Sequence, residues 1–377
     1  MNNGGSAGGE TLTRRAARLW CEPDDFESEE ANVLVTNYRR DEVKKLLFSI
    51  VCIVAAVVVA GLSLGYGSTS IDFFRCYQIV WEHVTGNIQN TVYDYIIVNE
   101  RMTRVIAAVL AGAGLAVAGC VMQSVMKNPL ADPYTTGISS GAGFGATLAI
   151  TAGISIVGGS YSIVVNAFVF ALIPMALMMA VSKMKGGDPT TMIMAGMAVM
   201  YIFNAFTTVM KLYADPDALA TLYTWTVGTV SDCTWPDLMI MAAVVIVGTV
   251  VTQLMSGKLN ILATGDDNAK AMGLNVENLR IGLLLLISLM VATVVSFTGL
   301  IGFVGLVAPH ICRVFVGADN RYLVVSSAMF GALLLLVADF VGRTIIAPAV
   351  LQVGVVTAFI GGPMFLYLIL RQKKSTW

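Results

Sequence analysis

Most of this chain consists of ten separate apolar segments. Each has about the length that a helix needs to cross the hydrocarbon core of a bilayer. The segments are residues 46–65, 102–126, 138–157, 161–182, 190–211, 237–256, 281–300, 303–318, 323–342 and 353–370. Of the 377 residues, 56% are hydrophobic and 12% are charged, whereas a soluble domain carries about 25% charged residues. The sequence therefore predicts an all-α, multi-pass membrane protein with about ten transmembrane helices.

The distribution of basic residues predicts the orientation. With both termini inside, most of the 23 Lys and Arg residues flank the inner ends of the segments, as cytoplasmic loops require. We expect a cell (cytoplasmic or inner) membrane protein with a flexible cytoplasmic tail at 1–45, a transmembrane domain at 46–371 and a short cytoplasmic tail at 372–377. The first tail is too polar to bury a core, and a regulatory or partner-docking role for it stays open.

The motifs of soluble enzymes are absent from the sequence. It has no GxxxxGK[ST] nucleotide loop and no CxxC pair, and its two histidines are His83 and His310. We therefore predict no catalytic residue, no metal site and no bound cofactor. Cys76 and Cys233 both fall on the predicted outer side, where a disulfide between them is the minor alternative to two free thiols.

Two signatures interrupt the apolar pattern. They read NPLADP at 128–133 and GLIGFVGLVAPHICR at 299–313. Helix-breaking backbone at membrane depth is tolerated only where protein or a water-filled path surrounds it. A chain with many spans and broken helices is typical of a transporter.

The longest loop on the predicted inner side covers residues 256–280 and is longer than a connection between antiparallel helices needs to be. Within it, Gly265 and Gly273 bound a stretch, Asp266–Met272, that is expected to form a short helix. This loop is predicted to dock a cytoplasmic partner.

Four charged residues stand near the predicted outer ends of the spans. Asp339 and Arg343 are four residues apart and are expected to form an ion pair on one helix face. Arg101 and Arg104 also share a helix face. They either reach toward lipid headgroups or form a basic patch that grips carboxylates of an external partner.

Together these residues resemble the FecCD-type permeases, the membrane subunits of ABC importers for iron–siderophore complexes, haem and cobalamin. The likeness runs from about Arg101 to Leu370 and excludes the first tail. It is carried by Arg101-Met-Thr-Arg104, by the blocks Ala111–Ala142 and Gly265–Val276, by the second helix-breaking signature, and by Val353–Leu370.

The resemblance implies a homodimer with the type II ABC importer permease fold and a translocation path along the dimer axis. It implies two cytoplasmic ATPase subunits, which would use ATP and magnesium, and an extracellular or periplasmic substrate-binding protein. The cargo would be an iron complex (siderophore or haem) or a cobalamin-like chelate. No nucleic acid partner is expected.

The resemblance also assigns roles to residues. ATPase coupling falls to Gly265, Asp266, Ala269, Gly273 and Leu274. The inner gate falls to Asn128, Pro129 and Leu130, and docking of the binding protein to Arg101, Arg104 and Arg343. The chain departs from the family pattern at Thr103, where a proline is common, and at Val350 and Gln352, where an acid and a proline are usual.

Two other classes remain as alternatives. A secondary transporter would need intramembrane charges that bind a coupling ion, and the spans are poor in them. An intramembrane enzyme would need a nucleophile with its base, or a metal cluster, and neither is apparent in the sequence.

Overall fold

Helices form all the regular structure in the residues that the computed structural model describes, which are 26–66, 71–184, 189–347 and 349–371. The chain divides after Leu47 into two units, each considered by itself. The described part of the first unit is the beginning of helix α2 (Phe26–Gly65), so α2 starts within the segment expected to be a flexible tail. Residues 1–25 of that tail, and the predicted C-terminal tail 372–377, lie outside the described residues.

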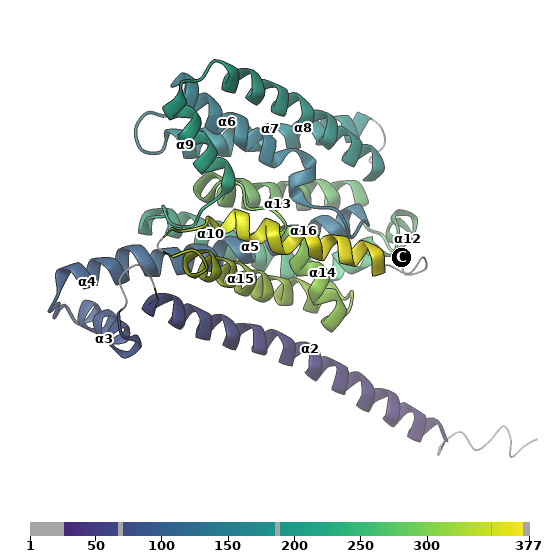
Figure 1. The fold of residues 1–377 in the computed structure, drawn as a ribbon. Coiled ribbons are helices and arrows are strands. Elements are labelled where there is room, and N and C mark those ends of the chain that lie inside the picture. The colour runs from purple at the N-terminus through teal and green to yellow at the C-terminus, as the bar shows by residue number, and fades with distance from the viewer. Residues whose placement is uncertain (1–25, 67–70, 185–188, 348, 372–377) are drawn as a thin grey trace, which may run out of the picture. The chain divides into compact units, whose positions relative to one another are not determined.

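The second unit contains the remainder of α2 and all the helices that follow it (Figure 1). After α2 its elements are α3 (Phe73–Val84), α4 (Thr91–Tyr95), the π-helix η1 (Ile96–Met102), α5 (Thr103–Met126), the 3-10 helix η2 (Pro133–Thr136), α6 (Ile138–Ala152), α7 (Ser162–Met184), α8 (Pro189–Leu212), α9 (Pro216–Val227), α10 (Trp235–Leu254), α11 (Ser256–Ala263), α12 (Asp266–Ala271), α13 (Val276–Thr298), α14 (Val304–Val316), α15 (Asn320–Thr344) and α16 (Val353–Arg371).

Seven helices in the described residues are long and apolar enough to cross a membrane. Three shorter apolar helices, in α6, α14 and α16, coincide with the remaining predicted spans. The prediction of an all-α polytopic membrane protein is confirmed, while the number of crossings and the orientation stay predictions.

Helix α5 lies at the centre of the second unit. It contacts α10, α13, α14 and α15, and 78% of the apolar window in Thr91–Met126 is buried, against 33% for the window of α10. Its glycines allow this crowding: a Cβ on Gly119 would overlap the carbonyl oxygen of Gly305 at the start of α14. Small residues permit close backbone approach where apolar burial alone gives helices little reason to associate.

Both helix-breaking signatures bend back into the helix bundle. Lys127 ends α5 in the left-handed conformation, with φ 49°, and the chain then returns through η2 to α6. There the Tyr134 hydroxyl accepts a hydrogen bond from Ile301 N at 3.0 Å, so the residue directly after the first signature meets the second signature. Protein groups thus satisfy backbone atoms that leave the helical pattern, as expected for irregular backbone among membrane helices.

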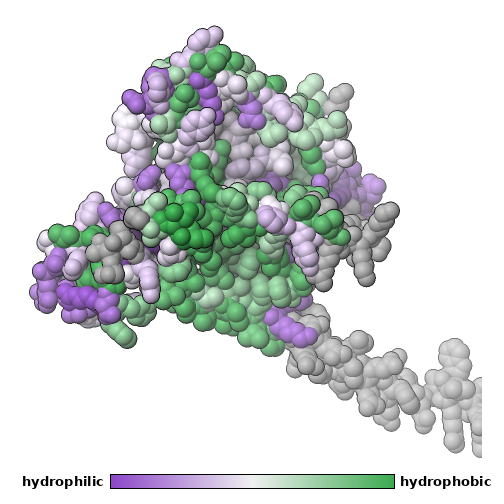
Figure 2. All heavy atoms as spheres, in the orientation of Figure 1, coloured by the Kyte–Doolittle hydropathy of each residue, from purple (hydrophilic) through white to green (hydrophobic). Residues whose placement is uncertain are grey.

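The helix ends define two ends of this unit, called here the α9 end and the α12 end. The α9 end holds the N-termini of α5 and α16 and the C-termini of α13 and α15, and the opposite termini of these four helices lie with α12 (Figure 1). Figure 2 shows apolar side chains spread over the flank of the bundle and hydrophilic residues gathered near α3 and α4. Exposed apolar side chains on the long helices suit contact with lipid.

Candidate coupling and gating site

Helix α12 is the second of two short helices, after α11, in the connection between α10 and α13. It covers Asp266–Ala271 between Gly265, with φ 123°, and Gly273, with φ 83°. Only glycine adopts such positive φ values readily, so the two glycines allow the chain to turn sharply into and out of the helix. The short helix predicted over 266–272 is confirmed.

One side of α12 holds it against the bundle. Ala269 is completely buried, and its carbonyl oxygen accepts a hydrogen bond from Leu274 N at 3.0 Å. Leu274 is partly buried against the main hydrophobic core. These two residues therefore anchor the segment to the bundle, and their role in coupling stays a prediction.

The Asp266 carboxylate ties α12 to two neighbouring helices. Oδ1 accepts a hydrogen bond from Lys127 Nζ, which follows α5. Arg280 of α13 donates through Nη2 to Oδ1 at 2.9 Å and to Oδ2 at 3.0 Å. Burial raises the pKa of the Asp266 carboxyl, but the hydrogen bonds and positive charges of Lys127 and Arg280 outweigh it, and the pKa lies below its ordinary value.

The other side of α12 faces outward. Asp267, Asn268, Lys270 and Met272 are exposed around the buried Ala269, and Met272 is 63% exposed. The sequence did not single out these four residues. The stretch 266–272 mixes polar residues with Ala269, Ala271 and Met272, and it is too short for a periodic pattern to give a face of a helix.

The predicted gate residues follow directly after Lys127. Asn128 Oδ1 accepts a hydrogen bond from Leu130 N at 3.0 Å, and Asn128 N donates to Gln123 O at 3.1 Å. This side-chain turn, together with a proline that cannot continue a helix, fixes a sharp stop. The structure therefore brings the predicted gate and the predicted coupling segment together through Lys127 and Asp266.

A second polar link joins the same region of α5 to α11. Ser124 Oγ donates to Asn320 Oδ1 at 2.9 Å, and Asn320 Nδ2 donates to Asn260 Oδ1 at 2.9 Å. Asn260 Nδ2 in turn donates to Asp319 Oδ1 at 2.6 Å. The sequence did not predict this network because its members come from α5, α11 and the start of α15, far apart along the chain.

At the α9 end, the predicted ion pair between Asp339 and Arg343 is confirmed, with 3.1 Å between Oδ2 and Nε. The sequence did not predict that Arg104 joins it: its Nε donates to Asp339 Oδ1 at 2.8 Å. The Asp339 side chain is completely buried, and those of Arg104 and Arg343 are 13% and 8% exposed. Two guanidinium groups therefore share one buried carboxylate.

Two of the arginines also bind the end of α2. Arg101 Nη1 donates to the carbonyl oxygens of Leu64 and Gly65, and Arg343 Nη1 donates to those of Ser63 and Tyr66, each at 3.2 Å. These carbonyls carry the negative end of the helix dipole, where cations stabilise it. Arg101, Arg104 and Arg343 thus have partners within the chain, and their role in docking a binding protein stays a prediction.

The departures from the family pattern lie at the same end. Thr103 is 1% exposed, and its hydroxyl donates to Asn99 O at 2.8 Å across the junction of η1 and α5. The helix therefore continues through this position without a proline. Val350 is exposed and Gln352 is partly buried, both in the segment directly before α16.

The described cysteines are all free thiols, including Cys76 and Cys233. No group of three or more His, Cys, Asp or Glu side chains in the described part of the chain is placed to hold a metal ion. The site thus consists of hydrogen bonds, ion pairs and backbone turns.

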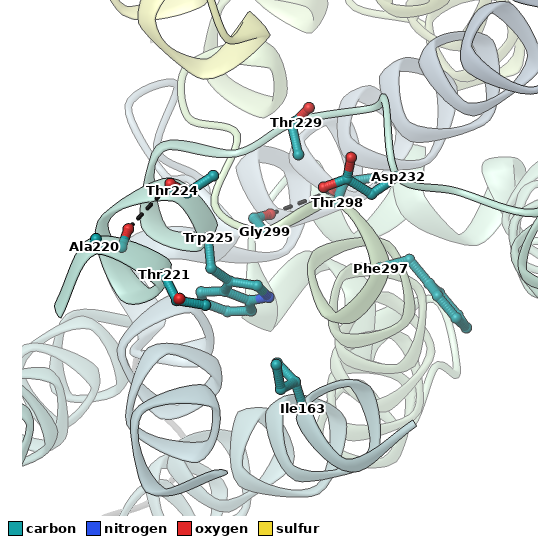
Figure 3. A pocket seen from close by; sticks show the side chains of 10 residues that line it. All are labelled: Ile163, Ala220, Thr221, Thr224, Trp225, Thr229, Asp232, Phe297, Thr298 and Gly299. Carbon is teal, nitrogen blue, oxygen red and sulfur yellow. Dashed lines mark hydrogen bonds between the residues drawn. The ribbon is translucent and has the colours of Figure 1, made fainter. Parts of the chain in front are cut away.

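A pocket of about 440 Å³ opens at the α9 end. Figure 3 shows the Trp225 ring of α9 lying between Ile163 of α7 and the end of α13. Its lining is Ile163, Ala220, Thr221, Thr224, Trp225, Thr229, Asp232, Phe297, Thr298 and Gly299. Hydroxyl groups and one exposed carboxylate give this pocket a polar wall at the opposite end from α12.

The model of the FecCD transport family matches residues 46–371, which include both helix-breaking signatures and the α12 segment. The chain belongs to the FecCD transport family. A FecCD protein is the permease subunit of an ABC importer and not an enzyme.

The alignments with relatives of this chain cover nearly the whole length of each relative. MJ0087 of Methanocaldococcus jannaschii is 38% identical over 340 residues, covering 88% of this chain and 96% of that protein. The hemin transport system permease protein HmuU of Yersinia pestis is 34% identical over 333 residues, covering 88% and 97%. A metal-chelate type ABC transporter, solved in an inward-facing conformation, gives a TM-score of 0.75 at 28% identity, covering 86% of this chain and 99% of that one.

Proposed function

We propose that this FecCD permease translocates an iron complex of the haem or siderophore class, with a cobalamin-like chelate as the alternative cargo. The similarity to HmuU, a hemin transport system permease protein, supports the choice of an iron complex. The observation that carries the mechanism is the contact between Asp266 of α12 and Lys127, because it joins a docking helix with a solvent-exposed side to the end of the central helix α5.

In this proposal the α12 end faces the cytoplasm and the α9 end faces outward, in the cell membrane. The excess of Lys and Arg on the predicted inner flanks supports this orientation. An external binding protein would then deliver the chelate at the α9 end, near the pocket that Trp225 lines.

The exposed side of α12 is the proposed contact for a separate ATPase subunit. Asp267, Asn268, Lys270 and Met272 face away from the buried Ala269. A short helix that packs through Ala269 and presents polar side chains and a flexible methionine suits a transient protein contact. ATP and magnesium would be bound by that partner, and closure of two such partners would move α12.

A second copy of the chain is the proposed partner for one face of α16. Phe359 is 76% exposed and Ile360 is 40% exposed, beside a shallow groove lined by Leu300, Phe303 and Ala358. Two such faces would enclose the translocation path. Replacement of Phe359 by Cys should give an oxidant-dependent cross-linked dimer, whereas Val247→Cys, on the exposed surface of α10, should not.

The transport proposal is tested by reconstitution. The chain, its ATPase and its binding protein would be purified together and placed in vesicles loaded with ATP, and uptake of radioactive ferric siderophore, ferric citrate, hemin and cobalamin would be compared. We expect uptake of one iron complex that needs ATP and is blocked by vanadate. Uptake that persists without ATP and collapses with an ionophore would instead establish a secondary transporter.

A further inference from the structure

The Asp266 carboxylate lies where three parts of the bundle meet. It accepts hydrogen bonds from Lys127 after α5 and from Arg280 of α13, while its own backbone begins α12. The Arg280 side chain is 4% exposed and the Asp266 and Lys127 side chains are 29% and 28% exposed. Arg280 is thus fixed in the bundle, and Lys127 stands at its edge.

The two links made by Asp266 differ in what they hold. Arg280 contacts both carboxylate oxygens, a two-point contact that fixes the orientation of the carboxylate as well as its position. Lys127 contacts Oδ1. The backbone of Lys127 is left-handed, and Asn128 and Pro129 follow it directly. A displacement of α12 therefore pulls on the last residue before the helix stop.

The polar network of Ser124, Asn320 and Asn260 adds a second attachment. It joins α11, which directly precedes α12, to the last turn of α5 and the start of α15. Gly265 and Gly273, both with positive φ, bound α12 on its two sides. On the α5 side, Asp266 is the α12 side chain that is hydrogen-bonded to Lys127.

We propose that Asp266, through Lys127, is a positioning residue that transmits the movement of α12 to the end of α5 at Asn128–Leu130. This inference rests on the proposed function and adds the residues that carry the coupling. The link does not hold the chelate or ATP; it sets how much transport each cycle of the ATPase produces.

A double-mutant cycle tests the link. Lys127→Gln, Asp266→Asn and the double variant would be reconstituted with the ATPase and the binding protein, and uptake and ATP hydrolysis would be measured in the same vesicles. The readout is the number of chelate molecules taken up per ATP hydrolysed, which a lower number of assembled complexes does not change. We expect each single variant to lower this ratio about ten-fold, within the range of coupling between sites.

If the two residues act through one another, the double variant loses little more than the worse single variant. Independent roles would instead multiply the two losses, to about a hundred-fold, and would overturn the proposal. Asp266→Glu, which keeps the charge, should restore most of the ratio. Lys127→Gln has particular value because it leaves the Asp266–Arg280 contact in place, so folding of the α12 segment is preserved.

Glu277→Gln is the matched control, since it neutralises an exposed carboxylate one turn before Arg280 on α13. Its ratio should equal that of the unmodified chain. An unmodified complex with no ATP-dependent uptake would refute the proposed function itself. Normal coupling in the unmodified complex together with normal coupling in Lys127→Gln would leave that function standing and refute this inference.

Discussion

The Arg104 guanidinium donates through Nε to Oδ1 of Asp339, 2.8 Å away, although the two residues are 235 positions apart in the chain. The pair fastens the beginning of α5 to the last part of α15, the two helices that also approach each other at Gly112 and Gly331. Arg343 approaches the other carboxylate oxygen, Oδ2, at 3.1 Å. One buried acid therefore organises the α9 end of the central helix pair.

Asp339→Asn should lower the free energy of unfolding by about 3–5 kcal/mol, because it leaves two nearly buried guanidinium groups without their carboxylate. Denaturant titration in detergent micelles would measure the change. Asp232→Asn, at an exposed carboxylate of the same end, should change it by no more than about 0.5 kcal/mol. Equal effects of the two variants would contradict the structural role of Asp339.

Arg101→Gln should loosen the C-terminal turn of α2, because the carbonyls of Leu64 and Gly65 lose a charged donor. Hydrogen exchange followed by mass spectrometry should show faster exchange in the peptide that spans residues 58–66 and unchanged exchange in α13. Arg321→Gln serves as the control, since that side chain is 61% exposed at the opposite end. Unchanged exchange in 58–66 would return Arg101 to the role of a docking residue alone.

Gly119→Val should separate α5 from α14, because even the first side-chain carbon overlaps the Gly305 carbonyl oxygen. We expect a loss of about 1–3 kcal/mol or more, typical of overpacked interiors, measured as a lower melting temperature. Gly282→Ala is matched to it: that glycine also lies in a helix, α13, but an added Cβ would meet no other atom within 4 Å. Gly282→Ala should be neutral or mildly stabilising. A Gly119→Val protein with an unchanged melting temperature would be incompatible with the close approach.

The stability contributed by Asp266 should depend on pH only under acidic conditions. Lys127 and Arg280 hold the pKa of this carboxyl below its ordinary value despite burial. A lowered pKa means that the stabilisation is complete above the ordinary carboxyl pKa, about 4, and is lost as the pH falls through the lowered value. The difference in melting temperature between the unmodified chain and Asp266→Asn should therefore be constant from about pH 6 to 8 and shrink below about pH 4. A difference that changes between pH 6 and 8 would point to another titrating group.

Much of the local structure could be predicted from residues close together in the chain. The predicted spans coincide with apolar helices, because a long run of apolar residues has few alternatives to a helix in lipid. The short helix at Asp266 was predictable because two glycines bound it. The pair formed by Asp339 and Arg343 was predictable because residues four apart share a helix face.

The sequence by itself thus determined the helical class, the approximate spans, the family likeness and the residues at which helices break. Only the tertiary structure decided which side chains meet: that Arg104 joins Asp339, that Arg101 binds the end of α2, and that Lys127 reaches Asp266. The physical reason is that helix formation depends on neighbours along the chain, whereas a buried hydrogen bond or ion pair depends on which helices lie against one another. That arrangement follows from close contacts such as Gly119 against Gly305, whose partners are distant in sequence.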